Sequence, residues 1–165
     1  MIDNYEYNLK LYNESIRKDL DIILTSTIPT QKNLMKTLLW INSIIIGLLT
    51  TIITSNIKNK IIIISISMPY LFSFLAIIIL LLSLKDGRVK SFATPPMKII
   101  EDIEWNKWTK IDALTKINKA TKDAFDINSK IIITRGKKIA KATNFTILSI
   151  ICIFIISIMY ANINL

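Results

Sequence analysis

Three long uncharged blocks dominate the pattern of hydrophobic and polar positions along the chain. They cover residues 37–55, 61–84 and 143–160, and none contains Asp, Glu, Lys or Arg. A helix of about 20 residues crosses a hydrocarbon core of roughly 30 Å. A short polar turn at 56–60 separates the first two blocks, so we expect an antiparallel transmembrane hairpin. Pro69 lies inside the second block, where nearby hydroxyl groups can satisfy the carbonyl that a proline leaves free. The pattern predicts an all-α membrane protein with three transmembrane helices.

Residues 1–36 predict an amphipathic helix before the hairpin. Their apolar side chains recur at steps of three and four: Tyr5, Leu9, Tyr12, Ile16, Leu20 and Ile23. Charges of both signs occupy many of the other positions, which favours docking on another helix over lying on anionic lipid. Pro29 interrupts the pattern, so we expect a second helix to begin near Thr30.

Residues 85–142 lie between the second and third blocks and are strongly basic. Pro95-Pro96 excludes a helix just before it, and residues 98–141 are expected to form one long helix or two shorter ones. Polar residues interrupt the apolar stripe of this segment at Asn118, Thr121 and Asn128. Such a stripe suits a pair of cytosolic helices better than a dry core.

The distribution of basic residues sets the expected orientation. Of the 21 Lys and Arg residues, five lie in residues 1–36, two in the turn, fourteen in 85–142 and none after residue 160. Because cytoplasmic loops carry the excess of Lys and Arg, we place the N-terminus in the cytoplasm and the C-terminus outside. We expect four parts: an N-terminal cytosolic amphipathic helix (1–36), the transmembrane hairpin (37–84), a basic cytosolic helical segment (85–142), and a third transmembrane helix with a short external tail (143–165).

Composition argues against several classes of function. The cytoplasmic bias accounts for the net charge of +9, so no direct binding of nucleic acid is expected. The chain has no histidine and one cysteine, Cys152, which removes Ser-His-Asp catalysis and His-bearing metal sites. Uncharged spans argue against ion-coupled transporters and voltage sensors. We therefore expect a protein that is not an enzyme and needs no metal and no cofactor.

Each span carries a narrow stripe of small or hydroxyl-bearing residues. The candidate helix-packing or pore-lining residues are Ser43, Gly47 and Thr50 in the first span, Ser65 and Ser73 in the second, and Thr146 and Ser149 in the third. Ser43 and Gly47 are four residues apart, a spacing that lets transmembrane helices approach closely. Ordinary packing is one interpretation. The other is a water-filled path in an oligomer, because three helices are too few to enclose a pore alone.

A second group of candidates combines indoles with basic side chains. It contains Trp105, Trp108, Arg135, Lys137 and Lys138. Tryptophan near a membrane commonly anchors at the head-group level, and basic clusters beside a span commonly bind anionic lipid. The alternative is a ligand site, in which an indole stacks on a base and basic groups bind phosphate. The sequence has no Gly-rich nucleotide loop to support that alternative.

The order of these parts resembles that of small bacterial anti-phage membrane effectors. The segments that carry the likeness are YNESIRKD at 12–19, before the hairpin, and INSK at 127–130 with RGKK at 135–138, before the last span. The layout is similar to the Pycsar transmembrane effectors and to the SLATT-type effector domains with two transmembrane helices. The resemblance implies cytosolic helices that sense a cyclic nucleotide or a partner protein encoded nearby. It also implies a pore-forming homo-oligomer that permeabilises the inner membrane in antiviral defence by abortive infection.

Two other classes stay open at this point. One is a non-catalytic membrane scaffold that holds a larger complex together. The other is a phage-type holin, although residues 85–142 make a longer cytosolic segment than a holin needs.

Overall fold

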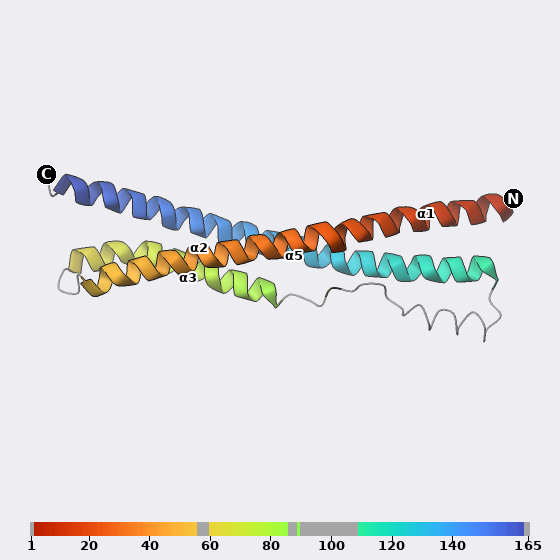
Figure 1. Cartoon of the computed structure of the whole chain (residues 1–165), viewed down its shortest axis with the longest axis horizontal. Helices are drawn as coiled ribbons and strands as arrows, with labels where there is room; N and C mark the ends of the chain where they lie inside the picture. Colours follow the sequence, from red (N-terminus) through yellow and green to blue (C-terminus); the bar gives the residue numbers. More distant parts are fainter. Residues whose placement is uncertain (1, 56–59, 86–88, 90–108, 164–165) are drawn as a thin grey trace. The chain divides into compact units, whose positions relative to one another are not determined.

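The computed structural model describes residues 2–55, 60–85, 89 and 109–163. Within these ranges every regular element is a helix. In chain order these are α1 (Ile2–Ile22), the π-helix η1 (Ile23–Thr27), α2 (Ile28–Ser55), α3 (Lys60–Leu84) and α5 (Lys110–Ile163). Figure 1 labels the four α-helices. The prediction of an all-α protein is confirmed for the described residues.

Three helical stretches are long and apolar enough to cross a membrane, by length and composition. They are Asn4–Ser55, Lys60–Leu84 and Lys110–Ala161. The three predicted uncharged blocks lie within α2, α3 and α5 respectively. Residues 56–59 of the predicted polar turn lie outside the described residues. The prediction of three helices able to span a membrane is therefore confirmed.

The predicted start of a helix near Thr30 is close to the start of α2 at Ile28, but the interruption expected at Pro29 is absent. α1, η1 and α2 follow one another with no non-helical residue between them. A proline inside an α-helix has no N–H to donate, and its ring clashes with the carbonyl group four residues back. Directly before Pro29, however, the N–H of Ile28 bonds to the carbonyl of Ile23, five residues back. This wider π-turn accommodates the proline without ending the helix.

The π-turn also keeps the buried residues of α1 and α2 on the same side of the continuous helical stretch. Asn13 and Leu20 are buried and seven residues apart. After η1, the buried positions again recur every seven residues: Ile28, Met35, Asn42 and Leu49. The step from Leu20 to Ile28 is eight residues, whereas a helix packed along a neighbour repeats its buried side about every 3.5 residues. One residue has to be absorbed, and the π-turn between Leu20 and Ile28 absorbs it.

α5 runs without interruption through the predicted boundary between the basic segment and the third span. The region expected to hold one or two helices is a single helix from Lys110 onward, and residues 98–108 lie outside the described part of the chain. Buried positions again recur every seven residues: Thr121, Asn128, Arg135, Ala142 and Ser149. This is the repeat of a helix that packs along its neighbours in the manner of a coiled coil.

The chain divides into two compact units. Unit 1 comprises Met1–Thr30 and Gly87–Ile133, and unit 2 comprises Gln31–Asp86 and Thr134–Leu165. Each unit therefore combines part of the long N-terminal helical stretch with part of α5, and unit 2 also contains α3.

In unit 1, α1 runs parallel to the first part of α5. Glu6 forms an ion pair with Lys110, and the carbonyl of Leu9 accepts a hydrogen bond of 3.1 Å from the side-chain amide of Asn118. The residue numbers rise together along the two helices, which defines the parallel direction. The predicted docking of the amphipathic helix on another helix thus has a partner within the chain.

In unit 2, two hydrophobic clusters join α2, α3 and the second part of α5. The first cluster contains Met35, Leu38, Ala76, Leu80, Ile139 and Ala142. The second cluster contains Ile45, Leu49 and Ile66, with the partly buried Ile153 packed against it. From the first cluster to the second, residue numbers rise in α2 and α5 and fall in α3. Unit 2 is therefore an up-down-up bundle in which α3 is antiparallel to the other two helices.

Candidate functional site

A layer of uncharged polar side chains lies between the two hydrophobic clusters of unit 2. This polar layer consists of Asn42 in α2, Ser73 in α3, and Thr146 and Ser149 in α5, each at most 4% exposed. In every helix these residues fall between the positions that form the first and second clusters. The polar layer thus lies inside all three uncharged blocks, with apolar packing on both sides.

Asn42 links α2 to α5 within this layer. Its Nδ2 donates to the hydroxyl of Thr146 and to the carbonyl of Leu38, both at 2.8 Å. The Thr146 hydroxyl then donates to the carbonyl of Ala142 at 2.9 Å. Asn42 Oδ1 is buried and accepts no hydrogen bond within the described chain. Leaving a buried acceptor unsatisfied costs about 1–3 kcal/mol, so a donor from water or from another chain would bind this oxygen favourably.

Ser149 links α5 to two successive turns of α3. Its Oγ lies 2.9 Å from the Oγ of Ser73 and 2.9 Å from the carbonyl oxygen of Pro69. Because a carbonyl oxygen can only accept, Ser149 donates to Pro69 and accepts the proton of Ser73. Ser149 thus bonds to the carbonyl of Pro69 itself, whereas the carbonyl that the proline leaves free is that of Ser65, four residues back. The nearby Ser67 bonds to the carbonyl of Ile64 in its own helix.

The structure brings together three of the seven predicted packing or pore-lining residues. Ser73, Thr146 and Ser149 meet in the polar layer. Ser65 is only partly buried and lies two turns closer to the start of α3. These positions give the third span, α5, a central role in holding the layer together.

The remaining three candidates, Ser43, Gly47 and Thr50, lie on an exposed face of α2. A Cβ atom added at Gly47 would meet no atom within 4 Å, and the Thr50 hydroxyl donates to the carbonyl of Ile46 in its own helix. We call this surface the Gly47 face. Within the described part of unit 2 it packs against no other helix, so it is available to another molecule.

Asn42 is the polar-layer residue that the sequence criteria overlook. Those criteria select small and hydroxyl-bearing residues, and an asparagine is neither. A signal for it does exist, because Asn42 stands seven residues after Met35 and seven before Leu49. It therefore belongs to the buried apolar stripe of α2, where a polar side chain requires a partner.

The described members of the predicted ligand site do not gather at one place. Arg135 is 3% exposed on the buried side of α5, whereas Lys137 is exposed and Lys138 is partly buried. Residues two apart on a helix do not face each other, so Arg135 and Lys137 point to different sides. Trp105 and Trp108 lie outside the described residues.

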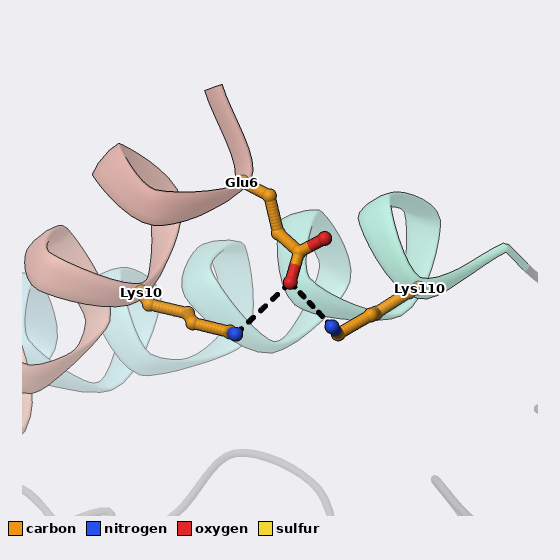
Figure 2. Close-up of polar contacts among 3 residues, drawn as sticks. All are labelled: Glu6, Lys10 and Lys110. Atoms are coloured by element: carbon orange, nitrogen blue, oxygen red, sulfur yellow. Dashed lines mark ion pairs between the residues drawn. The ribbon is translucent and has the colours of Figure 1, made fainter. Parts of the chain in front are cut away.

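Unit 1 contains a small charged contact of its own. Figure 2 shows the Glu6 carboxylate between two lysines, with Oε1 2.9 Å from Lys10 Nζ and 2.5 Å from Lys110 Nζ. The hydrogen bond from Lys110, followed by that from Lys10, lowers the pKa of Glu6 below its ordinary value of 4.5. The contact joins α1 to the beginning of α5 outside the uncharged blocks.

No protein-family model, curated protein or solved structure matches this chain. The geometry of its own residues is therefore the basis on which a function can be assigned.

Proposed function

We propose that the protein is an oligomeric effector that permeabilises a bacterial inner membrane. Unit 2 spans the bilayer, with the N-terminus in the cytoplasm and the C-terminus outside, as the excess of Lys and Arg in residues 1–36 and 85–142 favours. The observation that carries the proposal is the polar layer. Four amide and hydroxyl side chains are buried between apolar clusters at one level inside three uncharged spans.

The polar layer supports permeabilisation because its groups can exchange partners with water. In one copy, Asn42, Thr146, Ser73 and Ser149 satisfy one another across the helices, apart from Asn42 Oδ1. Hydrogen bonds between transmembrane helices contribute only about 0.6 kcal/mol on average, so breaking the bonds of this layer has a small penalty. Polar groups released by such a rearrangement would line a water path between several copies.

The Gly47 face supports assembly. Ser43 and Gly47 are exposed, carry little or no side chain, and stand one turn apart. Faces of this kind allow transmembrane helices to approach until their backbones touch, and van der Waals packing then drives association. A second copy is the partner that the proposal requires at this face.

Unit 1 is the part of the protein that would control the opening of the water path. It lies outside the proposed spans, and its α1 presents exposed aromatic side chains at Tyr5, Tyr7 and Tyr12. Such residues suit recognition of a partner protein. Gating by a cyclic nucleotide or by such a partner, and a role in antiviral defence by abortive infection, rest on the resemblance to small anti-phage effectors. The same exposed aromatic residues also favour the second candidate function, a non-catalytic membrane scaffold.

Inducible expression with measurement of membrane potential and dye entry tests the proposal. Neighbouring genes, including any nucleotide cyclase, are expressed together with the protein or omitted. We expect depolarisation and dye entry with the trigger present, and their loss in Gly47→Leu. Leu48→Phe adds bulk on a different exposed face of α2 and should leave dye entry unchanged. No depolarisation under any condition, together with stable recovery of a partner protein, would favour the scaffold instead.

A further inference from the structure

A cavity of about 460 Å³ opens among the three helices of unit 2. α2 contributes Leu49 and Ile52 to its wall, α3 contributes residues 61–66, and α5 contributes residues 153–161. The cavity lies beyond the second hydrophobic cluster, at the end of the bundle where α3 begins and α5 ends. It is therefore separate from the polar layer.

The wall of the cavity is unsuited to holding water. Among its described residues, only Ser65, Ser157 and Tyr160 have polar side chains. The hydroxyl of Ser157 donates to the carbonyl of Ile153 in its own helix, at 2.9 Å. A buried water needs two to four polar partners, and apolar cavities of this kind stay dry and bind apolar molecules. The apolar wall therefore favours a hydrocarbon over water as the occupant of the cavity.

The rim of the cavity faces the surroundings of the bundle. Ile61, Met159 and Tyr160 are 77%, 59% and 54% exposed. All three lie at the ends of the uncharged blocks, where a tyrosine sits at the head-group level of a bilayer. The α5 wall from Ile153 to Ala161 rises by about 12 Å at 1.5 Å per residue, close to the half-thickness of a hydrocarbon core of roughly 30 Å. The depth of the cavity therefore corresponds to one leaflet.

We propose that this cavity holds one acyl chain of a membrane phospholipid, with its head group beside Tyr160. The acyl chain enters from the leaflet at this end of the bundle and lies between α2, α3 and α5. The acyl chain fills the space at the end of the bundle where the three helices no longer pack against one another, past Ile66 of α3 and Ile153 of α5. The proposal requires that the uncharged blocks lie in lipid, but it does not require permeabilisation.

Photo-crosslinking in vesicles tests this site. The full-length protein is reconstituted with phosphatidylethanolamine, phosphatidylglycerol and a trace of a phosphatidylglycerol that carries a diazirine in one acyl chain. After irradiation, mass spectrometry locates the lipid adducts. We expect adducts concentrated on residues 61–66 and 153–161, in excess of those on the exposed Phe74 and Leu81. An even spread over all exposed apolar positions would overturn the proposal.

A matched pair of variants makes the test specific. Ser157→Phe fills the cavity and should remove most of the adducts on residues 153–161. Ser67→Phe introduces the same ring at an exposed serine that also bonds to its own helix but lies outside the cavity wall. That variant should keep the adducts. If Ser157→Phe does not fold, Ala161→Phe serves in its place. Unchanged labelling in a folded cavity-filling variant would contradict the proposal. Dye retention by the same vesicles separates this outcome from failure of the proposed permeabilisation.

Discussion

The side-chain amide of Asn42 donates a 2.8 Å hydrogen bond to the hydroxyl of Thr146, which lies 104 residues later in the chain. Both residues are buried in the middle of a bundle, with an apolar cluster on either side of them. Because the partner of Asn42 lies on α5, this bond fixes the register of the first span against the third. Its strength is directly measurable.

A double-mutant cycle with Asn42→Leu and Thr146→Val should give a coupling free energy of about 0.5–1.5 kcal/mol in favour of the native pair. Both substitutions keep approximately the native shape, so the cycle isolates the hydrogen bond. Unfolding in bicelles by a denaturing detergent, followed by circular dichroism, supplies the four stabilities. A coupling energy indistinguishable from zero would show that the two side chains do not interact.

Ser149→Ala should destabilise unit 2 more than Ser73→Ala does. Ser149 makes two interhelical hydrogen bonds, to Pro69 and with Ser73, whereas Ser73 loses one when it is substituted. We expect a difference of about 0.5–1 kcal/mol between the two variants. Ser67→Ala, at an exposed serine of α3, is the control and should change the stability little. The reverse order of Ser149→Ala and Ser73→Ala would contradict the assignment of two interhelical hydrogen bonds to Ser149 and one to Ser73.

Deletion of Ser26 should be tolerated, although it removes a residue from the interior of a helix. It shortens the step between Leu20 and Ile28 from eight residues to seven, so that an ordinary α-helical turn can replace η1. Deletion of the exposed Asn33 is the control. It rotates the residues of α2 before position 33 by about 100° relative to those after it, so that the two sets of buried residues no longer face the same side of the helix. Size-exclusion profiles and melting temperatures in detergent should show a folded protein for the first deletion and an aggregated one for the second.

The docking of α1 in unit 1 should weaken in acid. The pKa of Glu6 in the folded protein is below 4.5, so its ion pair with Lys110 of α5 stabilises the docking of α1 above pH 4.5, while its pair with Lys10 lies within α1. That contribution disappears as the pH falls from 4.5 through the lower folded-state value. Hydrogen exchange of α1, corrected for the intrinsic rate at each pH, should accelerate in this window. Glu6→Gln should remove this pH dependence, and Glu14→Gln, at an exposed carboxylate of the same helix, should retain it.

Hydropathy was sufficient to place the three long helices, because an apolar run of 18 or more residues without charge is typical of a transmembrane helix. It was insufficient at Pro29, where the local rule for proline predicts a break in the helix. The rule fails because the eight-residue step between Leu20 and Ile28 favours a π-turn, and this step becomes visible only when the buried positions are known.

The same limit applies to the amphipathic stripe of α1. Hydropathy assigns Tyr5 and Tyr12 to the docking face, yet both are exposed, and Asn13 is buried instead. Asn118 of α5 donates to the backbone carbonyl of Leu9, and Asn13 Oδ1 accepts no hydrogen bond within the described chain, so side-chain hydropathy does not explain which of the two neighbouring positions is buried. The polar layer could not be assembled from the sequence for a related reason, because pairing Asn42 with Thr146 requires the register between α2 and α5.

The central claim is that lipid surrounds α2, α3 and the second part of α5. Labelling with a membrane-impermeant maleimide tests it most directly, with single cysteines introduced at Lys60 and at Lys137 in a Cys152→Ser background. In intact inner-membrane spheroplasts, we expect Lys60→Cys to be labelled at once and Lys137→Cys to be labelled only after detergent is added. Equal labelling of both positions in intact spheroplasts, or protection of both, would contradict the account.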